Sequence, residues 1–426
     1  MRANIKRNGQ RRVVIVGGGL GGLKLASSLR DTDYQVVLVD KNNYNQFPPL
    51  IYQVASAGLE PSNIAFPFRR LFQDRKNFFF RMAEVQRIDT EEKAILTSIG
   101  TIHYDDLVLA EGATTNFFGN KNIEASALSM KTVSEAMRLR NTILQNLERA
   151  ETEDDEVKRQ RLLTIAIVGG GPSGVEIAGA LAEMRRTIIP RDYPDLNASE
   201  MHIYLINAGP RLLGAMDEKS SRKAEKALKE LGVEIIADCR VTDYQNHSLI
   251  LEDGDFIHAE TVIWVSGIKA NRIKGIPIES IGRGGRILTD GFNRVKGMTN
   301  VYAIGDQCLV EGEGDEAYPQ GHPQLAQVAL QQAANVARNL IAAEQGRPAC
   351  PFVYRNPGTM ATIGRKKAVV EIGKLKFGGF FAWLLWLVVH LRSILGVRNK
   401  TVVFLNWMWN YFNYKQSLRL ILKAKS

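Results

Sequence analysis

Two stretches of the chain share one pattern of apolar and small residues. Residues 13–16 and 165–168 are short apolar runs, and each leads directly into three consecutive glycines. Apolar residues then recur at helical spacing over residues 20–29 and 175–181. An apolar run bounded by glycine is typical of a buried strand, and recurrence every three or four residues is typical of a helix. Each stretch therefore predicts a strand, a tight turn and a helix.

The glycines of both stretches have the spacing G-x-G-x-x-G. These glycines are Gly17, Gly19 and Gly22 in the first stretch and Gly169, Gly171 and Gly174 in the second. In this arrangement the first glycine permits the turn, the second lets a pyrophosphate approach the backbone, and the third lets helix and strand pack closely. The helix N-terminus offers free N–H groups to the phosphates. Two copies in the same context favour two dinucleotide-binding sites over glycine turns without a ligand.

The strand that follows each glycine turn ends in a different polar residue. Asp40 follows the run 34–39, at the distance where a carboxylate accepts hydrogen bonds from ribose hydroxyls. Asn207 takes this place after the run 202–206. Because an amide is neutral, Asn207 cannot repel a 2′-phosphate, so both NADH and NADPH stay open as ligands of the second site. Arg211 lies four residues further on and is a candidate contact for such a phosphate.

Further apolar runs extend both units. Residues 233–236 and 261–265 predict more strands of the second unit, and residues 300–306 predict a strand that ends in Gly-Asp. The charged residues of 148–161 predict a solvated boundary where a helix passes into a linker. We expect an α/β fold with two Rossmann-like domains.

The C-terminal residues differ from the rest in charge and aromatic content. The chain has 426 residues and a net charge of +10, and the last 55 residues contain nine basic residues, no acidic residue and four of the five tryptophans. Residues 377–391 are apolar and without formal charge, which is shorter than the ~20 residues of a spanning helix. Tryptophan favours the headgroup level and basic residues favour anionic lipids. We expect an amphipathic segment lying at a membrane surface; an oligomer interface and a re-entrant hairpin are the alternatives.

The remaining composition excludes several classes. The three cysteines are far apart and form no C-x-x-C, so we expect no disulfide framework, no metal site and no thiol–disulfide chemistry. The basic tail is too apolar for a nucleic-acid surface. The N-terminal residues are polar and basic and contain no apolar signal-peptide core, so we expect no secretion.

Two segments resemble the two-dinucleotide flavoprotein family. Residues 300–306, ending in Gly-Asp, resemble its second flavin motif, and residues 107–113 resemble its crossover into the nucleotide-binding insert. The resemblance implies FAD on the first glycine turn, with Asp306 as a further FAD contact, and a nicotinamide dinucleotide on the second. It also implies that the second domain is inserted in the first: residues 1–125 and 286–375 form the FAD-binding domain, 126–285 the NAD(P)H-binding domain, and 376–426 the membrane-associating region.

Three more stretches narrow the resemblance. These are residues 43–55, residues 111–119 and the A-Q-x-A-x-Q-Q stretch at 326–332. Together with the Trp-rich tail they are similar to type II NADH:quinone oxidoreductases, over nearly the whole chain. The resemblance implies a peripheral, non-proton-pumping respiratory enzyme on the cytoplasmic face of the cell inner membrane, which passes a hydride from NADH to FAD and two electrons to a membrane quinone.

The resemblance also assigns residues. It places Gln327 and Gln331 beside flavin and quinone, and Glu176 between the nicotinamide and quinone regions. It adds Lys41, Ala113 and Gly267 as cofactor contacts. From the residues alone, the two glutamines share a helical face, which a solvated helix explains equally well, and Glu176 lies early in a helix, where the helix dipole favours a carboxylate.

The partners expected from these assignments are NAD(P)H, a membrane quinone and an anionic lipid surface, with no nucleic acid; a homodimer stays open. The competing hypotheses are a related NAD(P)H-dependent flavoprotein reductase with another acceptor and a membrane-associated nucleotide redox sensor. The colour of the purified protein, and recovery of NADH-bleached flavin on adding quinone, discriminates among them.

Overall fold

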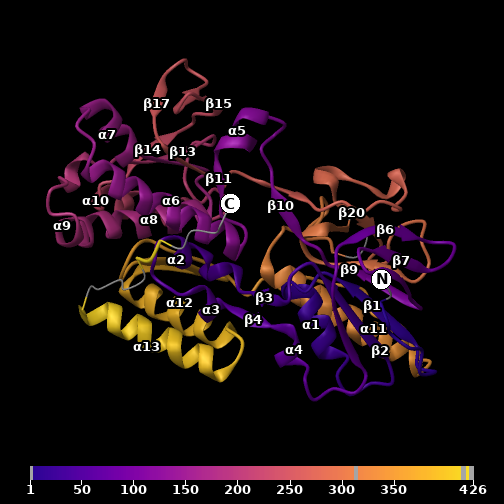
Figure 1. The fold of residues 1–426 in the computed structure, drawn as a ribbon. Helices are drawn as coiled ribbons and strands as arrows, with labels where there is room; N and C mark the ends of the chain where they lie inside the picture. The colour runs from indigo at the N-terminus through magenta and orange to yellow at the C-terminus, as the bar shows by residue number, and fades with distance from the viewer. Residues whose placement is uncertain (1–2, 311–314, 414–418, 422–426) are drawn as a thin grey trace. The chain divides into compact units, whose positions relative to one another are not determined.

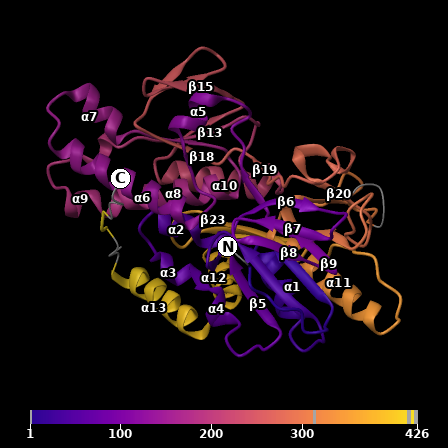
Figure 2. The ribbon, with the colours of Figure 1, turned by 45° about the vertical axis from the view of Figure 1, so that its right-hand side comes forward.

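The computed structural model describes residues 3–310, 315–413 and 419–421, and the chain divides into two compact units. The first unit comprises Met1–Gln46, Phe66–Thr114 and Ile268–Asn356, and the second comprises Phe47–Ala65, Thr115–Gly267 and Pro357–Ser426. Figures 1 and 2 show the ribbon in two views. Lys415, Lys423 and Lys425, which contribute to the basic tail, lie outside the described residues.

The first unit is built on a five-stranded parallel sheet with the order β21-β9-β1-β2-β5. Its strands are β1 (Arg12–Val16), β2 (Gln35–Asp40), β5 (Phe78–Met82), β9 (Asp106–Leu109) and β21 (Val301–Ala303). The antiparallel strands β6 (Val85–Asp89), β7 (Ala94–Thr97) and β8 (Gly100–His103) form a second sheet, and β20 (Ile287–Thr289) pairs with β22 (Cys308–Val310). Short strands β3 (Tyr44–Gln46), β4 (Ala65–Pro67), β10 (Ala113–Thr115) and β19 (Ile268–Ala270) lie at or near the points where the chain changes unit.

Helices α1 (Leu20–Ser28) and α11 (Ala326–Glu344) lie side by side in the first unit, which also contains the short α4 (Phe68–Leu71). The hydroxyl of Tyr34 donates a hydrogen bond of 2.9 Å to the carbonyl of Leu340 on α11. On the face of the parallel sheet opposite these helices, a core that includes Val14, Val37 and Ile95 joins the sheet to β7. The sheet is thus buried on both faces, which explains why its strands are nearly continuous apolar runs in the sequence.

The second unit repeats the five-stranded parallel sheet with the order β11-β18-β12-β13-β14. Its strands are β11 (Leu128–Ser129), β12 (Ile165–Val168), β13 (Ile203–Asn207), β14 (Glu234–Ala237) and β18 (Thr261–Trp264). Two antiparallel sheets accompany it: β15 (Val241–Gln245), β16 (Ser248–Leu251) and β17 (Phe256–His258), and β23 (Thr359–Thr362), β24 (Ala368–Ile372) and β25 (Leu375–Gly379). The helices are α2 (Ile51–Ala55), α3 (Pro61–Ile64), α5 (Lys121–Ser126), α6 (Val133–Glu151), α7 (Glu156–Leu163), α8 (Pro172–Thr187), α9 (Ile189–Asp192), α10 (Glu218–Glu230), α12 (Phe380–Ser393) and α13 (Val397–Asn413).

The bounds of the units differ from the domain boundaries expected from the sequence. Residues 47–65 and 357–375 were expected in the FAD-binding parts, but they belong to the second unit. The reason is packing: α2 lies against α6 and α8, and β23 lies against α8. The helix expected to end within 148–161 is α6, which ends at Glu151, but the linker that follows is limited to residues 152–155. The remaining residues form most of α7, whose first turn is capped by the Asp155 carboxylate.

The C-terminal residues form a pair of helices, drawn in yellow in Figure 1, where α12 and α13 lie side by side. Helix α12 buries Ala382 and Trp386 against the second unit. Large apolar side chains on the other side are exposed, among them Phe381 at 76% and Val388 at 57%. Within the described residues, no helix has both the length and the apolar character needed to cross a membrane.

Candidate dinucleotide sites and an adjoining buried network

The first glycine turn follows β1 and has room for a ligand at one glycine. Gly17 has a φ of +97°, and its amide donates to the carbonyl of Val39 at 2.8 Å. A Cβ at Gly17 would lie 2.4 Å from the carbonyl oxygen of Ala110, and one at Gly22 would lie 1.9 Å from the carbonyl oxygen of Gly17. At Gly19, no other part of the described chain comes within 4 Å of such a Cβ. Two glycines are therefore required by the fold, and the middle one leaves the backbone open.

The second glycine turn repeats this geometry after β12. Gly169 has a φ of +121°, and its amide donates to the carbonyl of Ile206 at 2.8 Å. A Cβ at Gly169 would lie 2.8 Å from the backbone of Val265, and one at Gly174 would lie 1.8 Å from the carbonyl oxygen of Gly169. A Cβ at Gly171 would again have no other described residue within 4 Å. Both turns present the opening that close approach of a pyrophosphate requires.

Asp40 holds the first glycine turn. Its carboxylate accepts hydrogen bonds from the backbone amides of Gly18 at 2.6 Å and Asn42 at 2.7 Å. Burial raises the pKa of this carboxyl, and the two amides act in the opposite direction. The buried side chain of Asn45 donates to the carbonyl of Gly18 at 2.7 Å, so the peptide groups on both sides of Gly18 are fixed. Asn45 was not expected as a site residue.

Asn207 holds the second glycine turn in the same way, through an amide oxygen. Its Oδ1 accepts from the backbone amide of Gly170 at 3.0 Å. Its Nδ2 donates to the carbonyls of Gly209 at 2.8 Å and Arg211 at 3.1 Å. The amide group thus connects the glycine turn to the loop after β13, and its two donors are directed at that loop.

Several further residues of the first unit meet at the same edge of its sheet. Asp40, Glu111 and Asp306 lie at or just after the carboxyl ends of β2, β9 and β21. Because carboxyl ends of parallel strands share one edge, these residues flank the glycine turn after β1. The backbone amide of Gly305 donates to Oε1 of Gln332 at 2.7 Å, and Gln324 donates to the carbonyl of Asp306 at 2.8 Å. The Gly-Asp segment is thereby attached to α11 and the segment leading into it.

Small residues let α1 approach α11. A Cβ at Gly21 would lie 3.4 Å from the carbonyl oxygen of Ala329. A Cβ at Gly305 would lie 3.1 Å from the Cβ of Ala329. The glycine turn, the Gly-Asp segment and the A-Q-x-A-x-Q-Q helix therefore come together in the first unit, although the first and the last are more than 300 residues apart in sequence.

The two glutamines expected as site residues lie on α11 in different surroundings. Gln327 is exposed in the second position of the helix. Gln331 is half-buried: its Nε2 donates to the carbonyl of Arg355 at 2.8 Å, and its Oε1 accepts from the amide of Arg355 at 3.0 Å. Gln331 thus fixes the segment that leaves the first unit, whereas the amide of Gln327 is accessible. Their assignment to the quinone stays a prediction.

The other expected cofactor contacts are placed as follows. Lys41 is exposed directly after β2, and Ala113 is 9% exposed at the start of β10. Gly267, at a φ of +114°, follows β18 in the second unit, and its carbonyl accepts from the amide of Asn116. Gly267 therefore lies near the carboxyl edge of the second sheet, with the second glycine turn and Asn207. Whether these residues contact a cofactor stays a prediction.

Glu176 on α8 is buried, although a glutamate early in a helix is also expected on a solvated face. Its pKa is raised to about 8 by burial, against a hydrogen bond from the backbone amide of Thr362. The nearby hydroxyl of Tyr52 is buried as well, and the charge of Glu176 contributes to raising its pKa. At neutral pH the side chain of Glu176 is therefore largely a protonated acid that can give up a proton.

Sequence reasoning missed a second carboxyl with a strongly raised pKa, that of the half-buried Glu111 in the first unit. Burial raises its pKa to about 7, and the side chain of Gln307 opposes this shift. Gln307 accepts from the amide of Glu111 at 3.0 Å and donates to the carbonyl of Asn271 at 2.9 Å. An acidic residue directly after a fully apolar strand was the available signal, because that position lies at the carboxyl edge of the sheet.

A cavity of about 110 Å³ lies within the second unit. One part of its lining is aromatic and comes from the C-terminal helices and α2; another is polar and comes from α8 and the segment after β23. Its lining includes Tyr52, Gln53, Glu183, Thr362, Arg365, Trp383, Trp386 and Trp407.

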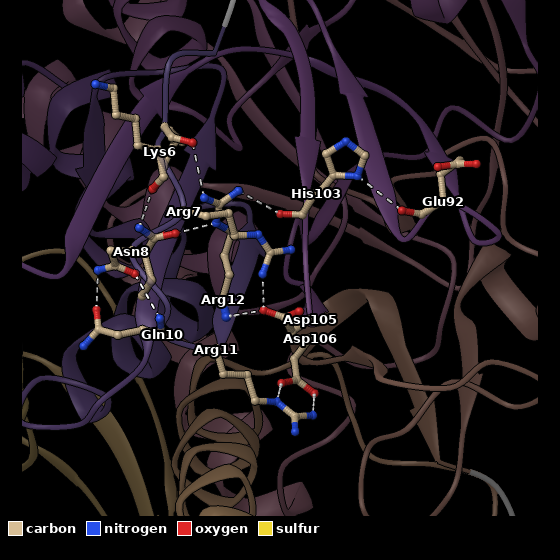
Figure 3. Close-up of polar contacts among 12 residues, drawn as sticks. Lys6, Arg7, Asn8, Gln10, Arg11, Arg12, Glu92, His103, Asp105 and Asp106 are labelled. Carbon is tan, nitrogen blue, oxygen red and sulfur yellow. Dashed lines mark hydrogen bonds and ion pairs between the residues drawn. The ribbon is translucent and has the colours of Figure 1, made fainter.

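A second hollow, of about 670 Å³, lies at the amino ends of the first sheet. Arg11, next to the lining residue Arg12, pairs with Asp106 at 2.7 Å (Figure 3). The buried Arg12 donates to the side chain of Gln35 and to backbone carbonyls of Ile5 and His103. Because Arg12 begins β1 and Gly17 follows its end, this hollow lies at the opposite edge of the sheet from the glycine turn.

Comparison with known proteins agrees with this geometry over nearly the whole chain. The sequence model of the family described as pyridine nucleotide-disulphide oxidoreductase matches residues 11–333, and that of the NDH2 C-terminal domain matches residues 357–414. Two type II NADH:quinone oxidoreductases of Mycobacterium tuberculosis are 35% and 33% identical over 417 and 420 residues. These alignments cover 94% and 95% of this chain and 87% and 89% of the relatives.

Solved structures show the same fold. NDH2 from Plasmodium falciparum in complex with NADH has a TM-score of 0.87 at 21% identity, covering 97% of this chain and 100% of that chain. A sulfide:quinone oxidoreductase from Aquifex aeolicus has a TM-score of 0.71 at 18% identity, covering 95% of each chain. The chain belongs to the pyridine nucleotide-disulphide oxidoreductase family and, within it, to the type II NADH:quinone oxidoreductases.

Proposed function

We propose that this protein oxidises NADH and reduces a quinone, with FAD as its bound cofactor. The observation that carries the proposal is the pair of glycine turns, each with an open middle glycine, in a chain whose C-terminal residues match the NDH2 C-terminal domain. The M. tuberculosis relatives bear the same activity in their names. Cys239, Cys308 and Cys350 are free thiols in the structure.

The first turn fits the pyrophosphate of FAD. Gly19 is open, Gly17 and Gly22 have no room for a side chain, and Asp40 ends the next strand, where it can accept from a ribose hydroxyl while it holds Gly18. FAD bound there would supply the hydride acceptor for the nicotinamide and the two-electron donor for the quinone. Lys41, Ala113 and Asp306 are proposed as further contacts of this cofactor.

The second turn fits NADH. Gly171 is open to the pyrophosphate, and the N-terminus of α8 directs free amides at it. Asn207 carries no charge to reject a 2′-phosphate, so we propose that NADPH is also accepted, with NADH preferred. Gly267 is proposed as a contact because it lies at the same edge of the sheet.

We propose that Glu176, Gln327 and Gln331 act on the quinone. NADH supplies the two electrons and one proton equivalent, and the second proton comes from water. With its pKa raised to about 8, Glu176 holds a proton at neutral pH, can pass it to the reduced quinone oxygen, and regains one from water. The exposed amide of Gln327 can donate a hydrogen bond to a quinone carbonyl; Gln331 keeps the Arg355 segment in place.

The C-terminal helices are proposed to attach the enzyme, as a peripheral protein, to the cytoplasmic face of the inner membrane. Exposed apolar side chains such as Phe381, Phe404 and Leu405 lie on the same helices as Arg392 and Lys400. Apolar side chains enter the boundary of a bilayer, and cations attract anionic lipid. Attachment brings the enzyme to a quinone that partitions into the bilayer. A homodimer through the same apolar surface is the alternative use.

The decisive test is spectroscopic. The purified full chain should be yellow, NADH should bleach the flavin within seconds, and a soluble quinone should restore the colour with one quinol formed per NADH consumed. A colourless protein that does not take up FAD contradicts the proposal. Flavin that NADH reduces but quinone does not reoxidise indicates another acceptor or a sensor.

The membrane assignment has its own test. Deleting the residues after Gly378 should release the protein from membranes and lower the rate with long-tailed quinones by at least tenfold, while NADH still bleaches the flavin. Size measurement of the full chain in detergent distinguishes a dimer interface. A truncated protein that still sediments with vesicles contradicts the assignment.

A further inference from the structure

A chain of hydrogen bonds in the second unit connects the C-terminal helix α13 to α2. The indole Nε1 of Trp407 donates to Oε1 of Gln53 at 2.8 Å. Nε2 of Gln53 in turn donates to the hydroxyl oxygen of Tyr52 at 2.9 Å. All three residues line the cavity of about 110 Å³ described above.

The chain continues to Glu176 through Thr362 at the end of β23. The side chain of Thr362 hydrogen-bonds the hydroxyl of Tyr52, and its backbone amide hydrogen-bonds the carboxyl of Glu176. Tyr52 is 6% exposed and Glu176 is 9% exposed, so water competes little for these groups. Trp407, a half-buried residue of α13, is thereby linked to the buried acid Glu176.

The chemistry of the links fixes their direction. An indole N–H only donates, so the oxygen of the Gln53 amide must face Trp407 and its NH₂ must face Tyr52. Tyr52 then accepts from Gln53, and its own proton has to be donated elsewhere. Besides Gln53, the hydroxyl of Tyr52 hydrogen-bonds the side chain of Thr362, whose own hydroxyl donates to the carbonyl of Gly364 at 3.4 Å and so leaves its oxygen able to accept. Trp407 therefore decides, through Gln53, where the proton of Tyr52 points.

We propose that Gln53 is a positioning residue for quinone reduction: held by Trp407, it orients the hydroxyl of Tyr52 toward Thr362 and Glu176, and so couples the seating of α13 to proton delivery by Glu176. The inference rests on the proposed function. It predicts that an enzyme whose C-terminal helices are displaced still takes a hydride from NADH but protonates the quinone slowly.

Among the described residues, three other ionisable groups lie near this network. Glu183, on α8, and Arg365, after β23, line the same cavity, and the amide of Arg365 donates to Glu183 at 3.4 Å. His390 of α12 stacks on Trp386 at 4.0 Å between ring centroids, and burial lowers its pKa to about 4, so it is neutral at physiological pH. A change in the pH profile near 8 therefore reports on Glu176, because burial raises the pKa of Tyr52 above its ordinary value of 10.

The experiment compares Gln53→Leu, Gln53→Glu, Trp407→Phe and the double variant Gln53→Leu/Trp407→Phe, each as the full chain in detergent with FAD. Gln245→Leu, an exposed glutamine on β15, is the matched control. Flavin reduction by NADH is followed by stopped flow, and turnover of a short-tailed quinone is followed from pH 6 to 9.5. Flavin content and melting temperature identify any variant that does not fold, in which case the other single variants carry the test.

We expect Gln53→Leu to lower kcat for the quinone about tenfold and Trp407→Phe about threefold, with KM changed less than twofold and flavin reduction unchanged. Both should move the alkaline limb of the pH profile in the same direction. The kcat of the double variant should be no lower than that of Gln53→Leu, because both substitutions interrupt the same series of hydrogen bonds. Gln53→Glu, which can accept from Trp407 but cannot donate to Tyr52 when ionised, should resemble Gln53→Leu.

Additive effects in the double variant, an unmoved pH profile, or wild-type turnover by Gln53→Glu overturns the inference. These outcomes differ from failure of the proposed function, in which the wild-type flavin is reduced by NADH but is not reoxidised by quinone. Equal loss in Gln245→Leu also overturns the inference, because the effect would then be general to glutamine loss.

Discussion

The two glycine turns share their backbone geometry but differ in the side chain that holds them. In each turn the first glycine amide donates to the neighbouring strand at 2.8 Å, the third glycine has no room for a methyl group, and the middle one is open. Asp40 holds the first turn by accepting from the amide of Gly18, and Asn207 holds the second by accepting from the amide of Gly170.

This difference separates two tasks that one residue usually performs. Holding the turn requires only an acceptor oxygen, which a carboxylate and an amide both provide. Selecting among ribose ligands depends on charge, which only Asp40 has. Asn207 uses its second polar atom for another purpose, since Nδ2 donates to the carbonyls of Gly209 and Arg211. Asn207 therefore fixes the loop after β13 to the second turn, but it carries no charge that would repel a 2′-phosphate.

The largest effect is expected from the third glycine of either turn. Gly22→Ala and Gly174→Ala place a Cβ within 1.9 Å of a carbonyl oxygen, so strand and helix must separate. We expect a loss of stability of about 3 kcal/mol or more in each, measured by chemical unfolding. Gly22→Ala should also lose FAD and Gly174→Ala should retain it.

The matched controls are Gly19→Ala and Gly171→Ala, which have open space at the Cβ. Both should unfold within about 0.5 kcal/mol of the wild type, while the first weakens FAD binding and the second raises the KM for NADH. If the controls lose as much stability as Gly22→Ala, the structural and ligand-binding glycines have been misassigned.

The next largest effect is expected on the pH dependence of stability, through Glu176. The pKa of Glu176 is about 8 in the folded protein, against about 4.3 in an unfolded chain, so between these values only the folded state keeps the proton. Stability is therefore lost as pH rises through this window. Glu176→Gln should remove the loss, gaining on the order of 3 kcal/mol relative to wild type between pH 5 and pH 8. Parallel stability curves of the two proteins would contradict the buried position of this acid.

Glu111 supplies the matching test in the first unit. Because the pKa of Glu111 is about 7, the loss of stability that it causes ends near pH 7. Its partial exposure reduces the loss in the free energy of unfolding to about 1–2 kcal/mol. Glu111→Gln should flatten the stability curve below pH 7 and leave its slope from pH 7 to 8 unchanged. A change of slope above pH 7 would show that the two acids titrate together.

The smallest effect is expected from exchanging charge at the second turn. In Asn207→Asp the carboxylate still accepts from Gly170 but faces two carbonyl oxygens, so we expect a loss of about 1–2 kcal/mol. The added charge should lower kcat/KM for NADPH about tenfold and that for NADH less than threefold. A wild type that strongly prefers NADPH, or a variant with an unchanged ratio of the two nucleotides, contradicts the role given to Asn207.

The sequence by itself determined the two glycine turns and the strands around them. Glycine spacing and apolar runs are local properties, because a strand buried on both faces must be apolar throughout and a turn with positive φ requires glycine. The runs at 202–206, 233–236 and 261–265 correspond to β13, β14 and β18 within one residue at each end. The apolar run at 377–391 likewise corresponds to α12, apart from its first three residues.

Only the tertiary structure decided which segments share a unit and which polar groups meet. Residues 47–65 and 357–375 joined the second unit because their apolar faces pack on α6 and α8, and no local pattern encodes that choice. The chain of Trp407, Gln53, Tyr52 and Glu176 spans more than 350 residues of sequence. Burial of a carboxyl, and the hydrogen bond of one amide to another residue's side chain, depend on what the rest of the chain places around them. The sequence shows such residues singly, and folding determines their partners and their protonation.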